Sequence, residues 1–392
     1  MPPVEQGDEF DVIIVGAGLV GLALARALRG AGLRLALMDR VARPAALPSE
    51  PEGWDQRVYS ISPGSEAFLA AQGAWPGPTR VARVAGMQVS GDAGGHIAFD
   101  AQEARTTHLA SIVEGRVLLD ALWQGLAEQD VALLMPAQCI DLQFDAAARL
   151  ALDDGRVLHA RLVVAADGAH SWVRTQAGIP AAVSAYGQTA VVANFACQRA
   201  HRGVAFQWFR RDGVLALLPL PGNRCSLVWS AGEGLAAELL ALAPQALAER
   251  VREASAGVLG ELELITPAAG FALQLVKVRE LVRHRLALVG DAAHNLHPLA
   301  GQGVNVGFQD ARALADVLRE RGSCPDVGEH RLLRRYERSR REDILAMTLA
   351  TDGLKKLFAA DSQALSWLRN RGLTLVHGVA PLKRRLMAHA LG

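Results

Sequence analysis

The chain has 392 residues, of which 51% are hydrophobic and 21% charged, and its formal net charge is +1. This composition excludes a disordered chain and leaves enough apolar side chains for a large core. The small net charge gives no general reason to expect nucleic-acid binding. No apolar run reaches the roughly 20 residues of a membrane span, and the acidic start of the chain is unlike a secretion signal. We therefore expect a cytoplasmic protein of two or three structural units.

The cysteines are widely separated and form no CxxC pair, which argues against a zinc site or a dithiol redox centre. We expect no bound metal. The cysteines are interpreted as reduced, mostly buried thiols: Cys139, Cys197, Cys225 and Cys324.

Strand and helix patterns alternate in the first part of the chain. Asp11–Val15 is predicted as a buried parallel strand, Leu19–Arg29 as a helix and Leu33–Asp39 as a second strand. Apolar residues at helical spacing predict a helix over Ser111–Gln129. Arg161–Ala166 indicates a third buried strand, so this part of the chain is typical of a parallel α/β sheet.

The second part begins differently. Val183–Ser230 is rich in β-branched and aromatic residues with Pro/Gly turns, which predicts antiparallel sheet. Arg285–Gly290 returns to the buried-strand pattern and Gly303–Arg321 to the helical one. From Glu329 onward the chain is predicted to be helical.

These patterns predict an α/β fold in which a Rossmann-like dinucleotide-binding domain carries an inserted antiparallel β-sheet substrate domain and a C-terminal helical segment. The predicted divisions are 1–75, 105–180 and 276–328 for the discontinuous nucleotide domain, 76–104 and 181–275 for the β-rich domain, and 329–392 for the helical region.

The first motif is Gly16-Ala-Gly18-Leu-Val-Gly21, between the first strand and the first helix. Gly16 permits a tight turn, Gly18 lets the backbone approach a pyrophosphate at the helix N-terminus, and Gly21 permits close helix packing. Asp39 ends the second strand, about where a carboxylate binds adenosine ribose hydroxyls. The motif predicts dinucleotide binding, the alternative being a glycine turn of an ordinary βα unit.

Two later motifs follow buried strands. One is Asp167-Gly168-Ala-His-Ser171-Trp-Val-Arg174. The other runs from Gly290-Asp291-Ala-Ala-His294 through Pro298 to Gly301-Gln-Gly303-Val-Asn305. In this order and spacing, the three motifs resemble those of the para-hydroxybenzoate hydroxylase-type flavoprotein monooxygenases. The resemblance covers nearly the whole chain.

The resemblance implies tightly bound, non-covalent FAD with NAD(P)H as co-substrate. It links the middle segment, including Asp167 and Arg174, to both nucleotides. It implies that the last segment holds the ribityl chain and flavin ring. The implied cofactor-binding residues of that segment are Gly290, Asp291, Pro298, Gly301, Gly303 and Asn305.

Elementary chemistry agrees with these implied roles. Asp291 at a strand end can accept hydrogen bonds from ribityl or ribose hydroxyls. The amides at Gly301–Gly303 open a helix and favour a flavin anion. Pro298 has no N–H and can pack on a ring without an unmet donor. No general base is assigned; His297 and Pro298 are the flavin-adjacent catalytic candidates, although His294 and His297 are interpreted first as loop histidines that hold local backbone.

Two arginines complete the predicted cofactor site. Asp55-Gln-Arg57 resembles the family segment whose arginine lies near the flavin. Glu114-Gly-Arg116 resembles a helix start whose arginine approaches the cofactor, with Gly115 where the family usually has Asn. The alternative for each arginine is a surface ion pair.

Within this family, the ubiquinone-biosynthesis hydroxylases are most similar. Phe209–Leu220, with its Ala-Leu-Leu-Pro-Leu ending, and Leu368–Leu373 resemble their segments. The chain has no second GxGxxG, no redox cysteine pair and no WxWxIP, which argues against Baeyer–Villiger monooxygenases, disulfide reductases and flavin-dependent halogenases.

The resemblance implies that the protein uses NAD(P)H and O2 to hydroxylate the aromatic ring of a hydrophobic polyprenylated phenol in ubiquinone biosynthesis. Other proteins of that pathway are implied partners. Two alternatives remain: an FAD oxidoreductase that acts on a prenyl-type substrate without inserting oxygen, and a flavin-binding scaffold in a biosynthetic assembly.

The end of the chain has a basic and apolar pattern. After Asp361 it contains no acid, and it carries Arg369, Arg371, Lys383, Arg384 and Arg385. Apolar residues at i, i+4, i+7 and i+11 from Leu375 predict a helix with one apolar face. That face either docks on the protein core or gives peripheral contact with the inner membrane.

Overall fold

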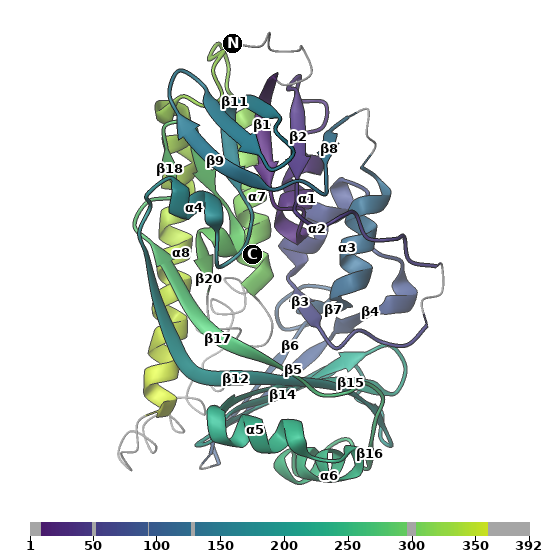
Figure 1. Cartoon of the computed structure of the whole chain (residues 1–392). Helices are drawn as coiled ribbons and strands as arrows, with labels where there is room; N and C mark the ends of the chain where they lie inside the picture. Colours follow the sequence, from purple (N-terminus) through teal and green to yellow (C-terminus); the bar gives the residue numbers. More distant parts are fainter. Residues whose placement is uncertain (1–8, 49–51, 93, 127–129, 296–302, 360–392) are drawn as a thin grey trace.

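The computed structural model describes residues 9–48, 52–92, 94–126, 130–295 and 303–359. Within them, a largely parallel sheet forms the upper part of Figure 1 and a mostly antiparallel sheet of nine strands the lower part. Strands β12 (Ala181–Cys197) and β17 (Ala269–Val278) run from one part toward the other. The region between the two sheets is where a ligand can contact both.

The parallel sheet contains the strands predicted from the buried apolar runs. β1 (Glu9–Val15) pairs in parallel with β2 (Leu35–Met38) and β11 (Val157–Ala165), and β11 pairs in parallel with β19 (Leu286–Leu288). Val12, Ile13 and Ile14 are fully buried because both faces of a parallel sheet are covered. The other strands of this sheet are β8 (Ala132–Leu134), β9 (Cys139–Phe144), β10 (Ala148–Leu152) and β18 (Val282–Arg283).

Helices α1 (Leu19–Ala27) and α7 (Gly303–Arg319) pack against each other and bury their apolar faces on this sheet. Helix α7 buries Phe308, Ala311 and Leu314 at the i, i+3 spacing of one helical face. Other helices of this half are α2 (Pro63–Ala71), α3 (Gly115–Gln124), α4 (Trp172–Gln176) and the short 3₁₀ turn η2 (Gly290–Ala292).

The nine-stranded sheet is antiparallel except where β13 (Val204–Arg210) pairs in parallel with β5 (Gly86–Ser90). Helices α5 (Glu233–Ala241) and α6 (Pro244–Ala254) cover one of its faces, below the sheet in Figure 1. Its other strands are β6 (His96–Asp100), β14 (Gly213–Leu220), β15 (Arg224–Gly232), β16 (Leu262–Leu264) and β20 (His294–Asn295). The antiparallel prediction for Val183–Ser230 is confirmed.

A third, three-stranded sheet joins the two halves. It has the order β3 (Val58–Ile61), β7 (Ala110–Glu114) and β4 (Val81–Val84), the last preceded by the 3₁₀ turn η1 (Pro78–Arg80). Its buried residues pack against β14. This sheet therefore takes strands from both sides of the predicted domain boundaries near 75 and 105, and the division into domains stays a proposal.

The predicted helix over Ser111–Gln129 is wrong at its start. Ala110–Glu114 forms strand β7, and helix α3 covers only Gly115–Gln124. The five strand residues are all buried, and the β-branched pair Ile112-Val113 favours a pleated strand over a helix. Apolar spacing alone could not separate the two because a fully buried strand has no polar face.

The C-terminal prediction is confirmed as far as the structure describes the chain. Helix α8 (His330–Ala359) lies along the parallel sheet, and the Tyr336 hydroxyl donates a hydrogen bond to the Leu288 carbonyl. The basic end after Asp361 lies outside the described residues. No helix among the described residues is long and apolar enough to cross a membrane. All four cysteines are free, and three of them are buried, as expected.

Candidate active site

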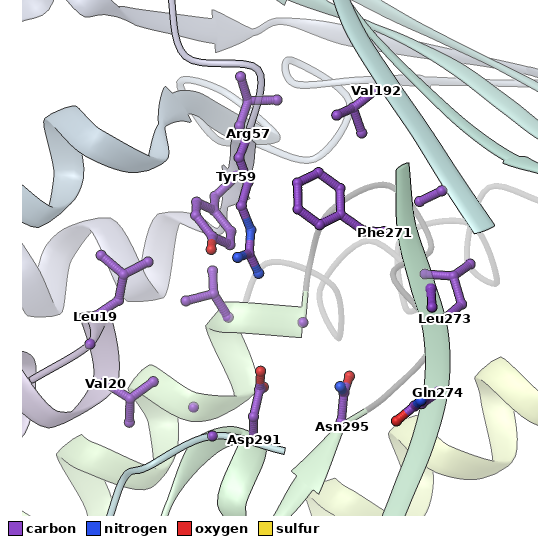
Figure 2. Close-up of a pocket in the computed structure, with 18 of the residues that line it drawn as sticks. Leu19, Val20, Arg57, Tyr59, Val192, Phe271, Leu273, Gln274, Asp291 and Asn295 are labelled. Atoms are coloured by element: carbon purple, nitrogen blue, oxygen red, sulfur yellow. The ribbon is translucent and has the colours of Figure 1, made fainter. Parts of the chain in front are cut away.

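A cavity of about 340 Å³ lies between the carboxyl ends of the parallel strands and the nine-stranded sheet. Gly18, Gly168 and Asp291 line it from the loops after β1, β11 and β19. Val192 and Phe271 line it from β12 and β17 (Figure 2). Its size falls within the usual range of about 300–1,000 Å³ for ligand pockets. Ligands of open α/β sheets bind at this edge, beyond the carboxyl ends of the strands.

Two helices begin at this cavity with glycine. Gly18 is the N-cap of α1, and Gly303 is the first residue of α7. Both line the cavity, and a Cβ atom built on either one meets no atom of the described residues within 4 Å. Unpaired amides at helix N-termini bind anions such as phosphate. The described residues therefore leave the N-terminal amides of these two helices uncovered by side chains on the cavity side.

The other two glycines of the first motif act by packing. A Cβ on Gly21 would lie 1.9 Å from the Gly16 carbonyl oxygen, and one on Gly16 would lie 2.3 Å from the Ala166 carbonyl oxygen. Gly16 also has a φ of +112°, which other residues rarely adopt. These two positions need glycine whether or not a ligand binds.

Two carboxylates stand at strand ends near the cavity. Asp291 is exposed to the cavity, yet protein surrounds it, and this desolvation raises the pKa of its carboxyl. Asp167 accepts a hydrogen bond from the Val173 amide, while its Oδ1 is buried and has no partner among the described residues. Burial likewise raises the pKa of Asp167. A hydroxyl-bearing ligand in the cavity can bind Asp291, whereas Asp167 lies beside the cavity and does not line it.

The turn that presents Asp291 is held by three neighbouring side chains. The Gly290 amide donates to Asp310 Oδ2 at 3.0 Å, and Arg174 Nη1 donates to the Ala292 carbonyl at 2.8 Å. Tyr336 from α8 bonds the Leu288 carbonyl just before the turn. Arg174 and Asp310 are buried, so these bonds are protected from water.

Asp310 is the centre of a buried charge network. It accepts hydrogen bonds from His294 Nε2 at 2.7 Å and from Arg340 Nε at 2.8 Å. Burial disfavours the charged imidazolium and by itself lowers the pKa of His294. The attraction of the Asp310 carboxylate and its hydrogen bond are together larger, so the pKa of His294 is raised. The two cationic partners likewise lower the pKa of Asp310. His294 thus holds local structure, as its sequence context suggested.

Arg57 crosses the cavity between two aromatic rings. Its guanidinium carbon lies 5.3 Å from the Tyr59 ring centroid and 5.5 Å from that of Phe271, and Figure 2 shows it between them. Tyr59 belongs to β3 and Phe271 to β17. The contact joins the three-stranded sheet to the nine-stranded sheet by cation–π attraction.

The segment before Arg57 is anchored from two sides. Asn194 Nδ2 donates to the Asp55 carbonyl at 2.7 Å, and the Asp55 amide donates to Glu114 Oε1 at 2.6 Å. Glu114 is fully buried, and Arg80 and Arg116 balance its charge. Buried anchors of this kind fix the direction in which Arg57 leaves the backbone.

The predicted cofactor residues divide into two groups. Arg57, Gly18, Asp291 and Gly303 line the cavity. The others support it from behind or beside it: Gly16, Gly21, Asp39, Arg116, Asp167, Arg174, Gly290 and Asn305. The candidates His297, Pro298 and Gly301 lie outside the described residues.

Three supporting residues are committed to backbone contacts. Asn305 accepts from the Ser62 amide and donates to the Ser60 carbonyl, which ties α7 to the end of β3. Asp39 accepts from the Ala17 amide in the glycine turn at 2.8 Å. Arg116 donates to the Gly53 carbonyl and does not line the cavity.

The sequence prediction missed the residues that the nine-stranded sheet contributes. Phe271, Leu273 and Gln274 line the cavity from β17, and Tyr59 lines it from β3. No motif marks them. β17 overlaps the end of the predicted β-rich domain, and only strand alternation could have drawn attention to its residues, whereas Tyr59 stands two residues after Arg57 in a strand.

Comparison with known proteins places the chain in a family. The model of the FAD binding domain family matches residues 9–59 and 141–350. A ubiquinone hydroxylase UbiL of Rhodospirillum rubrum is 38% identical, covering 97% of this chain and 89% of its own. The 3-demethoxyubiquinol 3-hydroxylase of Escherichia coli is 35% identical, covering 97% and 98%. The chain belongs to the FAD-dependent ubiquinone-biosynthesis hydroxylase family.

Solved structures agree on the fold of this hydroxylase family member. PqsL of Pseudomonas aeruginosa, described as a probable FAD-dependent monooxygenase, is 26% identical with a TM-score of 0.76, covering 93% of this chain and 99% of its own. The p-nitrophenol 4-monooxygenase of Pseudomonas putida is 18% identical with the same TM-score, which shows the fold alone. The predicted family, α/β fold class and enzyme class are confirmed.

Proposed function

We propose that this flavoprotein is an FAD-dependent monooxygenase that uses NAD(P)H and O2 to hydroxylate the aromatic ring of a polyprenylated phenol in ubiquinone biosynthesis. One observation carries the proposal. The cavity joins nucleotide-binding features, namely Gly18, Gly303 and Asp291, to an apolar wall from the nine-stranded sheet. Family membership supplies the flavin, and the apolar wall suits a hydrophobic substrate.

The residues present fit FAD. Among the described residues, nothing fills the space at Gly18 and Gly303, which leaves helix N-terminal amides for the pyrophosphate and for the flavin ring. The cavity-facing Asp291 is an acceptor for hydroxyl groups. Asp39, at the end of β2, is held beside the glycine turn to receive the adenosine ribose.

FAD, when bound, supplies the redox chemistry by which electrons from NAD(P)H activate O2 for insertion of one oxygen atom. The chain supplies binding and orientation. Asp291 is fixed by the bonds to Gly290 and Ala292, so its carboxylate meets the cofactor already positioned. The Val192, Phe271 and Leu273 wall excludes water from the reacting ring.

NAD(P)H is proposed to enter the same cavity transiently. The chain contains no second GxGxxG motif, so no separate dinucleotide domain is indicated. Arg57 is the one arginine among the described lining residues and can attract the phosphates of an incoming nucleotide.

Oxygen labelling tests the reaction. The FAD-loaded protein, NAD(P)H and a short-chain prenylphenol are incubated under ¹⁸O2, and the product is analysed by mass spectrometry. We expect one ¹⁸O atom per hydroxylated ring. Label arriving from H2¹⁸O, or NAD(P)H oxidation without oxygen uptake, contradicts the proposal.

A polyprenylated phenol partitions into lipid, so the enzyme must meet it at a membrane surface or receive it from another protein of the pathway. We propose peripheral contact with the inner membrane through the basic end of the chain, Lys383, Arg384 and Arg385. Delivery by a protein partner is the alternative that a vesicle experiment separates.

A further inference from the structure

The wall that the nine-stranded sheet gives to the cavity is apolar with one polar end. Val192, Phe271 and Leu273 supply its aliphatic and aromatic part. Gln274 from β17 and Asn295 from β20 also line the cavity and carry uncharged amides. A pair of amides beside an apolar wall is the pattern expected for a ligand with one polar end and one apolar end.

The strand register brings the two amides together. Asn295 lies opposite Val276 in the antiparallel pair of β20 and β17. Gln274 is two residues before Val276, so its side chain leaves the same face of the ribbon. Diagonal neighbours of this kind are about 7–8 Å apart, within reach of one small ring. In Figure 2 the Gln274 side chain extends toward Asn295, which stands beside Asp291.

Both amides are available to a ligand. Neither side chain has a hydrogen-bond partner in the part of the chain that the structure describes. Each amide offers two N–H donors and a carbonyl acceptor. The other polar side chains of the cavity differ, because Arg57 stacks between the Tyr59 and Phe271 rings, Tyr59 carries a phenol hydroxyl beside that guanidinium, and Asp291 is a carboxylate in the turn after β19.

The proposed function requires a substrate that fits this division, because a polyprenylated phenol has ring oxygens at one end and a hydrocarbon tail at the other. Building on that function, we propose that Gln274 and Asn295 bind the oxygen substituents of the ring. The tail then lies along Phe271, Leu273 and Val192. This orientation places the ring next to Asp291 and the cofactor. The two amides then determine which ring carbon faces the cofactor.

Such a site should select strongly for the ring hydroxyl. A site that hydrogen-bonds a substrate hydroxyl rejects the analogue that lacks it, since its polar groups are then left unpaired. Contacts with the apolar wall contribute equally to the binding of both analogues, because both carry the same tail. The ratio of the affinities for a phenol and its deoxy analogue therefore measures the contribution of the amide hydrogen bonds separately from that of the apolar contacts.

The test uses the FAD-loaded protein with two probes, 2-farnesylphenol and farnesylbenzene, which differ only in the hydroxyl. Dissociation constants are taken from the change in flavin absorbance, after the flavin content of each variant is measured. We expect the wild-type protein to bind the phenol at least about fivefold more tightly, the effect of one net hydrogen bond. Gln274→Leu and Asn295→Leu should reduce this ratio toward one.

Val192→Ala is the matched control, because it trims the apolar wall without removing a polar group. It should weaken binding of both probes equally and keep the ratio. If both leucine variants keep the wild-type ratio of affinities for the two probes, the inference is wrong, but the proposed substrate class is unaffected. A wild-type protein that binds neither probe overturns the proposed substrate class together with the inference.

Discussion

Arg174 and Ala292 connect the two loops that carry the second and third motifs. The guanidinium Nη1 donates a 2.8 Å hydrogen bond to the Ala292 carbonyl, and Nη2 donates to the Ala169 carbonyl at 2.9 Å. Arg174 is only 5% exposed and does not line the cavity. The side chain therefore holds the turn of Asp291 in place, and contact of Arg174 with the nucleotides stays a prediction.

Replacing Arg174 by Met should weaken the fold and FAD binding together. The substitution leaves two backbone carbonyls unpaired, each costing about 1–3 kcal/mol, so the free energy of unfolding should fall by at least about 2 kcal/mol. Urea unfolding and FAD titration measure the two effects. Arg312→Met, at a side chain that is 61% exposed, is the control. A variant with normal stability and FAD affinity but slow flavin reduction would instead place Arg174 at the nicotinamide.

The motifs predicted which strand-end loops line the cavity because each position there depends on local chain geometry. A glycine turn followed by a helix places Gly18 at a helix N-terminus wherever the fold occurs. Asp291 follows a buried strand, and the carboxyl ends of parallel strands meet at one edge. The position of both residues at the cavity could therefore be inferred from residues within a few positions of each.

The substrate half could not be inferred in this way. Phe271 and Gln274 reach the cavity because β17 pairs with β12, about 80 residues earlier in the chain, and that register has no local signature. The cofactor-binding role of Asn305 stays a prediction, and the structure adds that its amide bonds the backbone at Ser60 and Ser62, more than 240 residues away, which no local pattern indicates. Contacts across such separations depend on the whole fold.

A larger side chain at Gly18 should weaken FAD binding, whereas a larger side chain at Gly21 should destabilise the fold. Gly18→Val fills open space at the N-terminus of α1, so FAD affinity should fall at least about tenfold while the melting temperature of the FAD-free protein changes little. Gly21→Ala places a methyl against the Gly16 carbonyl and should destabilise the fold by about 1–3 kcal/mol or more. Flavin titration and thermal unfolding separate the two. Unchanged flavin affinity in Gly18→Val rules out pyrophosphate binding there.

Charge reversal at the basic end of the chain should reduce membrane binding. Lys383, Arg384 and Arg385 can each contribute about 1 kcal/mol of attraction to anionic lipid, so their triple substitution by Glu should lower co-sedimentation with phosphatidylglycerol vesicles at low salt. High salt should weaken wild-type binding by screening. Reversing three exposed arginines elsewhere, Arg211, Arg279 and Arg331, gives the same charge change as a control. Equal binding by all three proteins favours delivery by a protein partner.

The His294–Asp310 pair should make stability depend on pH with a defined sign. Although burial opposes the charged imidazolium, Asp310 raises the pKa of His294 in the folded protein. The pair therefore stabilises the fold fully below the unfolded pKa of about 6.5, and this contribution is lost as the pH rises through the folded value. The stability difference between wild type and His294→Gln, from urea unfolding, should shrink across that interval. His284→Gln, at an exposed histidine, should show no such trend. A difference independent of pH would mean that the pKa of His294 is the same in the folded and unfolded protein, and a difference that grows as the pH rises would mean that the folded protein holds His294 neutral.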